Sequence, residues 1–344
     1  MSFATPLVDS LQGRTGAEVI AASVLSLILT MGTASPVVAK DWETITVLDV
    51  TAFPDDEQPR FYSQSKSLFR GPGGASLIWA RFGALFDDEA PNDPLGRHYH
   101  HFHEWALVLD GDYVIHEPVS PRQKGGALYQ YVQGTWLDRP AYTLHGGAWA
   151  NGGKRAQMPC TLLIFEEGDG SVVTIGPNGD HFKPDFPESK PAPYMPDWTA
   201  VKSFAHPWIV DTVGQLEWER DDEEPGLLVK WLSDDPAQGF RARLIKAPPG
   251  WSSQNSARPS WYASANRFLY ITWGDLRIQA YDKSGEPTAP MIARKDWFVH
   301  QAPRAPMSHG SGPATAGGAI WLEVTYARGI THGDSVIEAP IPLR

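Results

Sequence analysis

The sequence predicts an all-β protein with two related domains in tandem. From about residue 41, short runs rich in β-branched and aromatic residues follow one another, separated by Gly, Pro and Asp. The chain holds 32 Gly, 30 Pro and 14 Trp in 344 residues, which favours many short elements joined by tight turns over long helices. The same order of runs then recurs after roughly 150 residues, the period expected of a domain repeat.

Five strand-like runs occupy the first half of the chain. In order they are ITVLDV, SLIWARFGALF, WALVLDGDYVIHE, ALYQYVQG and TLLIFEEG. Hydrophobic residues make up 42% of the chain and charged residues 20%, so these runs can bury a substantial core. A proline-rich stretch at 181–200 without apolar periodicity follows, and it is predicted to be an extended linker.

The runs after this linker parallel those before it. RARLIKAPPGW corresponds to SLIWARFGALF, RFLYITWGDLRIQAYD to EWALVLDGDYVIHEP, KDWFVHQAPRAPMSHGSG to GTWLDRPAYTLHGGAW, and AIWLEVTYARG to CTLLIFEEGDG. The correspondence pairs Gly111 with Gly274, Trp136 with Trp297, and His145 with His309. We therefore expect two β domains, at 41–180 and 201–344.

Residues 1–40 form an N-terminal extension. Its run VIAASVLSLILTM, at 19–31, has the length of a signal-peptide core, and small residues offer a cleavage site after Ala39. The preceding segment carries Arg14 but also two acidic residues, so it lacks the positive charge of a signal peptide. The run is also too short to span a bilayer. Two alternatives stay open: an exported protein that loses this extension, or, slightly favoured, a cytoplasmic protein in which the run is a helix packed on the domain.

Charge and cysteine content exclude several classes. The net charge is −11 with His neutral and no Lys/Arg run is present, so a nucleic-acid partner is not expected. The acidic stretch at 217–226 is predicted to be a solvated loop rather than a cation site. Cys160 is the only cysteine, which excludes an internal disulfide and a multi-cysteine metal site. We expect it to be a buried, inert thiol.

The segment HYHHFHE places four histidines directly before a glutamate. If residues 98 to 109 form one strand, side chains alternate between its faces. His98, His100 and Glu104 then share one face, whereas His101 and His103 share the other. The first face offers two imidazoles and a carboxylate, a set that suits a divalent metal, and the second face offers no acid. The alternation therefore selects the first pair.

The spacing of these residues resembles the two motifs of the cupin family. The first motif, G(X)5HXH(X)3–4E(X)6G, is matched by His98, His100, Glu104 and Gly111, with Asn92 in place of the first Gly. The second, G(X)5PXG(X)2H(X)3N, is matched by Gly134, Pro140 and His145, with Tyr142 and Trp149 where Gly and Asn are usual. The resemblance covers 98–149 closely and, through the repeat, most of 60–330 more weakly.

The resemblance implies two cupin barrels in tandem, each a double-stranded β-helix or jelly roll. It also implies one divalent metal ion per chain, held by His98, His100, Glu104 and His145, with positions left open for substrate or dioxygen. Imidazoles and a carboxylate suit Fe(II), Mn(II), Ni(II), Cu(II) or Zn(II), and affinity alone does not choose among them. Fe(II) is the metal we favour. A barrel that keeps the ligands but does no chemistry is the alternative.

The second domain does not repeat the ligand set. Counting back from Gly274 puts other residues at the aligned positions: Arg267 for Glu104, Ala263 for His100, and Trp261 for His98. Only His309 is retained. One imidazole beside a guanidinium cannot hold a divalent metal, so we expect the second barrel to be metal-free and His309 to be a core histidine.

Four residues near the motifs are candidates for binding a small-molecule substrate. Phe102 and Tyr142 are predicted to line the pocket, which would suit a planar or moderately apolar compound. Arg97 and Arg139 flank the motifs and can anchor a carboxylate or an enolate, with salt bridges on the barrel rim as the alternative.

The function that the resemblance implies is a metal-dependent dioxygenase that cleaves a C–C bond of an aromatic, flavonoid-like or β-dicarbonyl compound. Glu104 is then a ligand and a candidate catalytic base. The quercetinase-like cupins are the nearer analogy, because gentisate-type sites lack the motif glutamate and oxalate decarboxylases usually carry ligands in both barrels. The alternatives are a non-oxidative lyase, decarboxylase or isomerase, and a non-catalytic zinc-binding sensor. Pairing through barrel edges predicts a homodimer.

Overall fold

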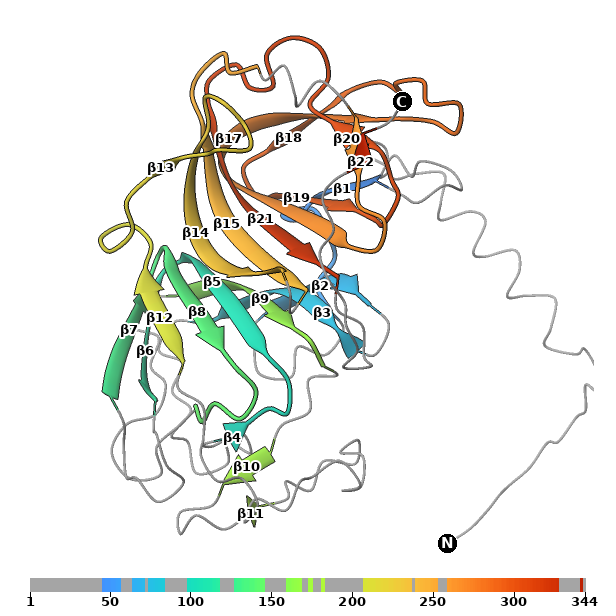
Figure 1. Ribbon diagram of the computed structural model, residues 1–344. Helices are drawn as coiled ribbons and strands as arrows, with labels where there is room; N and C mark the ends of the chain where they lie inside the picture. The colour runs from blue at the N-terminus through green and yellow to red at the C-terminus, as the bar shows by residue number, and fades with distance from the viewer. Residues whose placement is uncertain are drawn as a thin grey trace, which may run out of the picture. The chain divides into compact units, whose positions relative to one another are not determined.

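The protein is described from a computed structural model that covers twelve segments: 45–56, 64–71, 74–83, 98–117, 127–145, 159–168, 173–175, 181–182, 207–236, 239–252, 259–327 and 341–342. The regular secondary structure of these segments is β-strand, and the strands pair antiparallel (Figure 1). The prediction of an all-β protein is therefore confirmed. Among the described residues there is no helix with the length and hydrophobicity that a membrane span requires.

The first barrel is built around a six-stranded sheet with the order β12-β8-β5-β9-β3-β2. Its strands are β2 (Gln64–Arg70), β3 (Ser76–Phe82), β5 (Glu104–Asp110), β8 (Thr135–Arg139), β9 (Cys160–Glu166) and β12 (Trp208–Asp211). One face packs against the hairpin β6 (Asp112–Glu117) and β7 (Ala127–Val132) through a shared apolar core. A small sheet of β4 (His98–Tyr99), β10 (Val173–Ile175) and β11 (His181–Phe182) completes this part.

The second barrel contains an eleven-stranded sheet with the main path β13-β14-β15-β21-β17-β20-β16-β22. These strands are β13 (Glu219–Arg220), β14 (Leu228–Asp235), β15 (Phe240–Ala247), β16 (Ser260–Trp261), β17 (Asn266–Ala280), β20 (Met307–Ser308), β21 (Ala319–Tyr326) and β22 (Ile341–Pro342). Off this path, β18 (Met291–Arg294) and β19 (Trp297–Gln301) both pair with β17. Its interior is a separate apolar core that includes Leu269, Ile271 and Trp321.

Two strands pair with strands from the other half of the chain. The first strand, β1 (Ile45–Asp49), pairs with β19 of the second barrel, and β12 pairs with β8 of the first (Figure 1). Each exchanged strand covers a sheet edge that would otherwise carry unpaired backbone groups. The predicted domain bounds, 41–180 and 201–344, stay a prediction. The extension at 1–40 lies outside the described residues, as does all of the predicted linker except 181–182.

The internal repeat is visible in the backbone. Gly111 and Gly274 have φ angles of 81° and 78°, and a Cβ atom on either would lie 1.9 Å and 2.1 Å from the carbonyl oxygens of Pro159 and Gly318, respectively. A register shift also recurs just before each glycine, between Val108 and Asp110 in the first barrel and between Ile271 and Trp273 in the second.

One aligned pair in the predicted repeat is off by one residue. Trp136 lies opposite Leu107 on β5, and Phe298 lies opposite Tyr270 on β17. Since Leu107 and Tyr270 each stand four residues before the repeated glycine, Trp136 corresponds to Phe298 and not to Trp297. Both side chains are buried in the same apolar core between the two sheets.

Candidate metal centre

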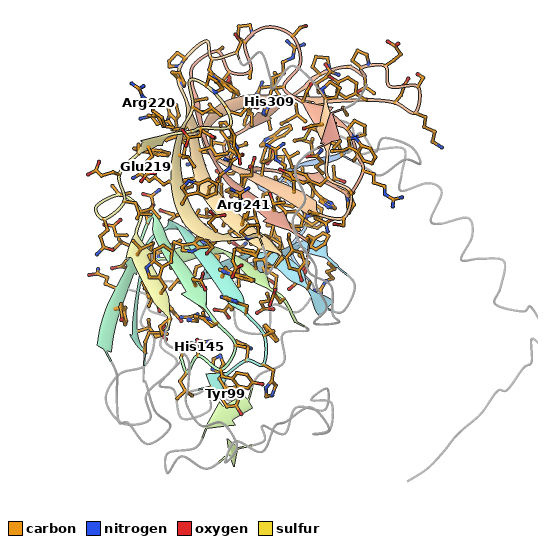
Figure 2. All side chains as sticks on the ribbon, viewed as in Figure 1. Tyr99, His145, Glu219, Arg220, Arg241 and His309 are labelled. Atoms are coloured by element: carbon orange, nitrogen blue, oxygen red, sulfur yellow. The ribbon has the colours of Figure 1, made fainter. Side chains whose placement is uncertain are left out.

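Three histidines from the two motifs come together inside the first barrel. The potential ligand atoms of His98, His100 and His145 all lie within 4.8 Å of one another, and all three side chains are buried. His98 and His145 face each other in an isolated antiparallel bridge, each donating its backbone N–H to the other's carbonyl, at 2.8 and 2.9 Å. Figure 2 labels His145 near Tyr99, at the end of the first barrel that carries β4.

The strand that was expected to sort the histidines is interrupted. β4 ends at Tyr99 and β5 begins at Glu104, so the prediction of one strand from 98 to 109 is wrong. The sorting itself agrees with the structure: the cluster contains His98 and His100. The bend in between brings Phe102 against His100, with their ring centroids 4.8 Å apart.

The other two histidines of the segment lie outside the cluster. The His103 ring pairs with the carboxylate of Asp138 and stacks on Trp105, with ring centroids 3.9 Å apart. The His101 ring packs edge-on against Tyr99 and Tyr142, at 5.5 and 5.6 Å between centroids. Each has aromatic neighbours of its own, as expected for packing residues rather than ligands.

His145 is fixed in the tautomer that a metal ligand needs. Its Nδ1 donates to the carbonyl oxygen of Thr143 at 2.9 Å, which leaves the lone pair on Nε2 facing the cluster. Burial, with a further contribution from the Arg139 guanidinium, holds the pKa of His145 well below its ordinary value. The imidazole is therefore neutral at physiological pH, the form that binds metals.

The turn before His145 adopts a conformation that usually requires glycine. Tyr142, which stands where the cupin motif has Gly, has a φ angle of 68°. Its backbone N–H donates to the carbonyl of His100 at 2.8 Å and so ties the second motif to the first. Tyr142 is a predicted substrate contact. Its ring packs on Tyr99 and His101, so it lies beside the cluster and part of its surface is already covered by these two residues.

Glu104 lies beside the three imidazoles, although its two oxygens have different environments. Oε2 is 3.3 Å from Nε2 of His100 and 3.9 Å from Nε2 of His145. Oε1 accepts a hydrogen bond from Nη1 of Arg139. Burial alone would raise the pKa of Glu104, but Arg139 and His100 outweigh it and hold that pKa well below its ordinary value. Glu104 is therefore a carboxylate at neutral pH.

Arg139 was considered either a substrate anchor or a salt bridge on the barrel rim, and it instead lies inside the barrel. Nη2 donates to Oε1 of Glu117 at 2.7 Å and to the hydroxyl of Tyr131 at 3.0 Å, and Tyr131 in turn donates to Glu117. All of these side chains are buried. The other predicted anchor, Arg97, lies outside the described residues.

Glu117 and Tyr131 hold Arg139 but are not among the site residues that the sequence predicts. A signal for Glu117 exists: on β6, Tyr113, Ile115 and Glu117 share one face, and the first two are core residues. A carboxylate at an inward position of a strand is rare unless it is paired or bound to a metal. Tyr131 carries no comparable signal, because a buried tyrosine on a strand is ordinary.

The charges of the described residues around this cluster do not balance. Among the described residues around the cluster, two buried carboxylates, Glu104 and Glu117, face one guanidinium, Arg139, and Oε2 of Glu117 has no hydrogen-bond partner. Burial raises the pKa of Tyr131 well above its ordinary value, so that side chain is neutral. An excess buried negative charge is costly unless a cation offsets it. The three imidazoles and this charge fit a divalent metal, whose bonds to His nitrogen measure about 2.0–2.1 Å.

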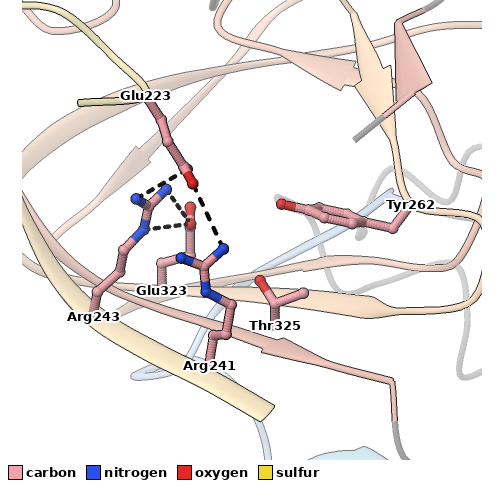
Figure 3. A pocket seen from close by; sticks show the side chains of 6 residues that line it. All are labelled: Glu223, Arg241, Arg243, Tyr262, Glu323 and Thr325. Atoms are coloured by element: carbon pink, nitrogen blue, oxygen red, sulfur yellow. Dashed lines mark hydrogen bonds and ion pairs between the residues drawn. The ribbon is translucent and has the colours of Figure 1, made fainter. Parts of the chain in front are cut away.

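The second barrel has an ion-pair cluster in place of a ligand set. Arg267, at the position of Glu104, donates to Oε2 of Glu323, and Arg243 donates to Oε1 of the same carboxylate at 3.0 Å. Arg243 also pairs with Asp221 at 3.2 Å, so two guanidinium groups face two buried carboxylates and the charges balance. Figure 3 shows Arg243 and Glu323 beside a cavity of about 10 Å³, room for about one water molecule.

His309, the one retained position, is held as a core histidine. Its Nδ1 donates to the carbonyl of Arg277 at 2.9 Å, and its ring packs near Trp251 and Trp321. Figure 2 labels it in the second barrel, well separated from His145. Within the described part of the chain, His98, His100 and His145 form the only group of three or more His, Cys, Asp or Glu residues arranged to hold a metal.

Buried histidines give the fold a pH dependence. Burial lowers the pKa of His309 and of His300 to about 4, from an ordinary value of 6.5. Between these values the unfolded chain binds more protons than the folded chain, so stability decreases as the pH falls through this window. We expect each histidine to contribute up to about 3 kcal/mol to this loss. Urea unfolding at about pH 7 and about pH 4.5 measures it, and His309→Gln should show a smaller loss than the wild type. Equal losses would contradict the assignment.

Cys160 and the acidic stretch behave largely as predicted. Cys160 is buried, and burial raises its pKa to about 12, which leaves an unreactive thiol. Most of 217–226 is exposed or half-buried, as expected of a solvated segment, but the stretch includes the short strand β13 and is not all loop. Asp221 is the exception, because its carboxylate turns inward to Arg243.

Comparisons with known proteins identify the fold. No protein-family model matches the sequence, and no curated protein is significantly similar to it. A structure from Nostoc punctiforme, provisionally described as a dioxygenase, is 13% identical, covers 86% of this chain and 87% of its own, and has a TM-score of 0.55. Protein Ylba from E. coli is 9% identical, with coverages of 88% and 96% and a TM-score of 0.51. Oxalate decarboxylase from Bacillus subtilis is 11% identical, with coverages of 99% and 88% and a TM-score of 0.52.

Proposed function

We propose that this chain, whose fold is two cupin barrels in tandem, is a metal-dependent enzyme with one divalent ion per chain. The ion would be held by His98, His100 and His145 together with Glu104. One observation carries the proposal: three buried imidazoles and an ionised carboxylate gather in a cluster whose described charged residues, Glu104, Glu117 and Arg139, carry an excess negative charge. Fe(II), Mn(II), Ni(II), Cu(II) and Zn(II) all suit this donor set. When bound, the metal supplies a Lewis acid and a template for an oxygen-donor substrate.

The protein's own residues prepare the site before any substrate arrives. The carbonyl of Thr143 orients His145, and the backbone bridge fixes His145 relative to His98. Because Oε1 of Glu104 is occupied by Arg139, Oε2 is the oxygen that can bind a metal or accept a proton from a substrate hydroxyl. Glu104 is thus a ligand through Oε2, and it is the candidate base where Oε2 is not bound to the metal. Phe102, against His100, is the candidate wall of the substrate pocket.

Within this function we propose a dioxygenase that cleaves a C–C bond of an aromatic, flavonoid-like or β-dicarbonyl compound. The motif glutamate and the single ligand set support this choice. A non-oxidative lyase or decarboxylase is the second candidate, and the likeness to oxalate decarboxylases favours it at the level of fold alone. A zinc-binding sensor without catalysis is the third. The homodimer and the location of the protein stay predictions.

Oxygen uptake separates the three candidates. The protein is loaded with Fe(II), and dissolved oxygen is followed against a panel of catechols, flavonols and β-diketones, with Zn(II)-loaded protein as the matched control. We expect substrate-dependent uptake with Fe(II) and none with redox-inert Zn(II). Turnover of a β-dicarbonyl or carboxylic acid without oxygen, and equally with Zn(II), would replace the dioxygenase by the non-oxidative enzyme. One tightly bound zinc without any turnover would favour the sensor.

A further inference from the structure

We propose that Arg139 is a positioning residue of the metal centre that makes the centre select an anionic oxygen ligand. By occupying Oε1 of Glu104, it leaves the ion one carboxylate oxygen and only part of the carboxylate's charge. The ligand class that fits is an enolate, a phenolate or a carboxylate. This inference rests on the proposed function, because it presupposes an ion among His98, His100 and His145.

The first support is the division of the Glu104 oxygens. Nη1 of Arg139 donates to Oε1, and Oε2 alone points to the imidazoles, 3.3 Å from His100 and 3.9 Å from His145. β5 and β8 fix this arrangement, because Glu104 and Arg139 are direct partners across the two strands. A charge-assisted hydrogen bond of this kind is short and about twice as strong as a neutral one, so it holds the carboxylate's orientation.

The second support is that Arg139 is itself held from behind. Its Nη2 donates to Glu117 at 2.7 Å and to Tyr131 at 3.0 Å, and its centre lies 5.8 Å from the tyrosine ring centroid. β6 and β7 supply these two residues, so the guanidinium is clamped between the six-stranded sheet and the hairpin that faces it. A buried guanidinium fastened on both sides cannot swing away from Glu104 when an ion binds.

The electrostatic consequence follows from the charges. A divalent ion, two carboxylates and one guanidinium would leave one net positive charge in a buried site. In a low-dielectric interior this charge attracts an anionic ligand strongly. Without Arg139, Glu104 would be free to give the ion both oxygens. The second oxygen would fill a coordination position and put the full carboxylate charge on the ion, so an anionic ligand would bind less tightly even where the net charge of the site is unchanged.

The test compares three forms of the protein with Co²⁺ and azide as probes. Arg139→Met with Glu117→Gln removes one positive and one negative charge, so the net charge of the cluster is unchanged while Glu104 is released. Glu117→Gln alone is the matched control, because a glutamine amide oxygen at this position can still accept the hydrogen bond from Nη2 and so leaves Arg139 on Glu104. Three quantities are measured: Co²⁺ affinity, azide affinity of the Co²⁺ form by visible absorption, and the carboxylate stretches that change in infrared spectra when Co²⁺ binds.

We expect the double variant to bind Co²⁺ at least about tenfold more tightly and azide at least about tenfold more weakly than the wild type. Its infrared stretches should change from those of a carboxylate bound through one oxygen to those of one bound through both, whereas Glu117→Gln should keep the wild-type pattern. If the wild type takes up one equivalent of Co²⁺ but the double variant matches it within about twofold in both affinities, the role of Arg139 is wrong and the metal centre stands. If the wild type takes up no Co²⁺, the proposed function itself fails. Should the double variant not fold, the wild type decides: a carboxylate bound through both oxygens there overturns the inference.

Discussion

Alanine at His145 or at His98 will abolish metal binding, with a loss of affinity of at least about two orders of magnitude. Each substitution removes one of three buried imidazoles whose ligand atoms lie within 4.8 Å of one another. Either change leaves two histidines and Glu104, whose carboxylate already accepts a hydrogen bond from Arg139. An ion held by these three ligands would dissociate into the buffer. The measurement is the metal content of each variant after loading with one divalent metal and dialysis against buffer.

His101→Ala and His103→Ala are the matched controls for this experiment. They remove imidazoles from the same short segment, but these rings pack against Tyr142 and Trp105 instead of the cluster. Both variants should keep the wild-type metal content. Full metal in His98→Ala or His145→Ala, or loss of metal in His103→Ala, would show that the wrong histidines have been assigned.

The second large effect is expected in the barrel without ligands. Glu323→Leu should lower the free energy of unfolding by about 3–5 kcal/mol, because it removes the buried carboxylate that the half-buried guanidinium of Arg267 shares with Arg243, and only Arg243 keeps other carboxylate partners. Burial would raise the pKa of Glu323, but these two arginines lower it to about 2. Since the folded pKa is depressed, the contribution of Glu323 is present above its ordinary value of 4.5 and is lost as the pH falls toward 2.

Urea unfolding at neutral pH measures this effect, with Glu219→Leu as the control. Glu219 lies on β13 and is exposed, so its replacement should change stability by less than about 0.5 kcal/mol. The metal content of Glu323→Leu should equal that of the wild type wherever the variant is folded, because its cluster lies in the other barrel. A loss of stability below about 1 kcal/mol would mean that these ion pairs contribute no more than exposed surface pairs and do not stabilise the second barrel.

The parts of the fold that depend on local patterns were predictable from the sequence. Alternating apolar runs bounded by Gly and Pro gave the principal strands, such as β3, β9 and β17. The repeated Gly-Asp pair at Gly111 and Gly274 indicated the tandem architecture, because at both places only glycine avoids a clash with a backbone carbonyl. The spacing of His98, His100 and His145 was sufficient to indicate the cluster, because it depends on two short motifs.

The parts that depend on contacts between distant segments were not predictable in the same way. Nothing local to Ile45–Asp49 or Trp208–Asp211 indicates that each joins the other half of the molecule. The bend after Tyr99 interrupts the strand that was predicted to place His98 and His100 on one face. The backbone bridge between His98 and His145 brings the two motifs together instead. The place of Arg139 depends on Glu117: alternation along β6 indicates that this residue faces inward, but nothing in the sequence indicates that it meets Arg139 of β8.

The most direct test of the metal centre is elemental analysis of the purified protein, before and after metal removal and reloading. We expect about one equivalent of a divalent metal per chain. Chelation should remove it, reloading should restore one equivalent, and His145→Ala should contain none. Two equivalents would show that the second barrel also binds metal, against the ion-pair cluster of Arg267 and Glu323. No uptake of any of the five candidate metals would contradict the centre itself.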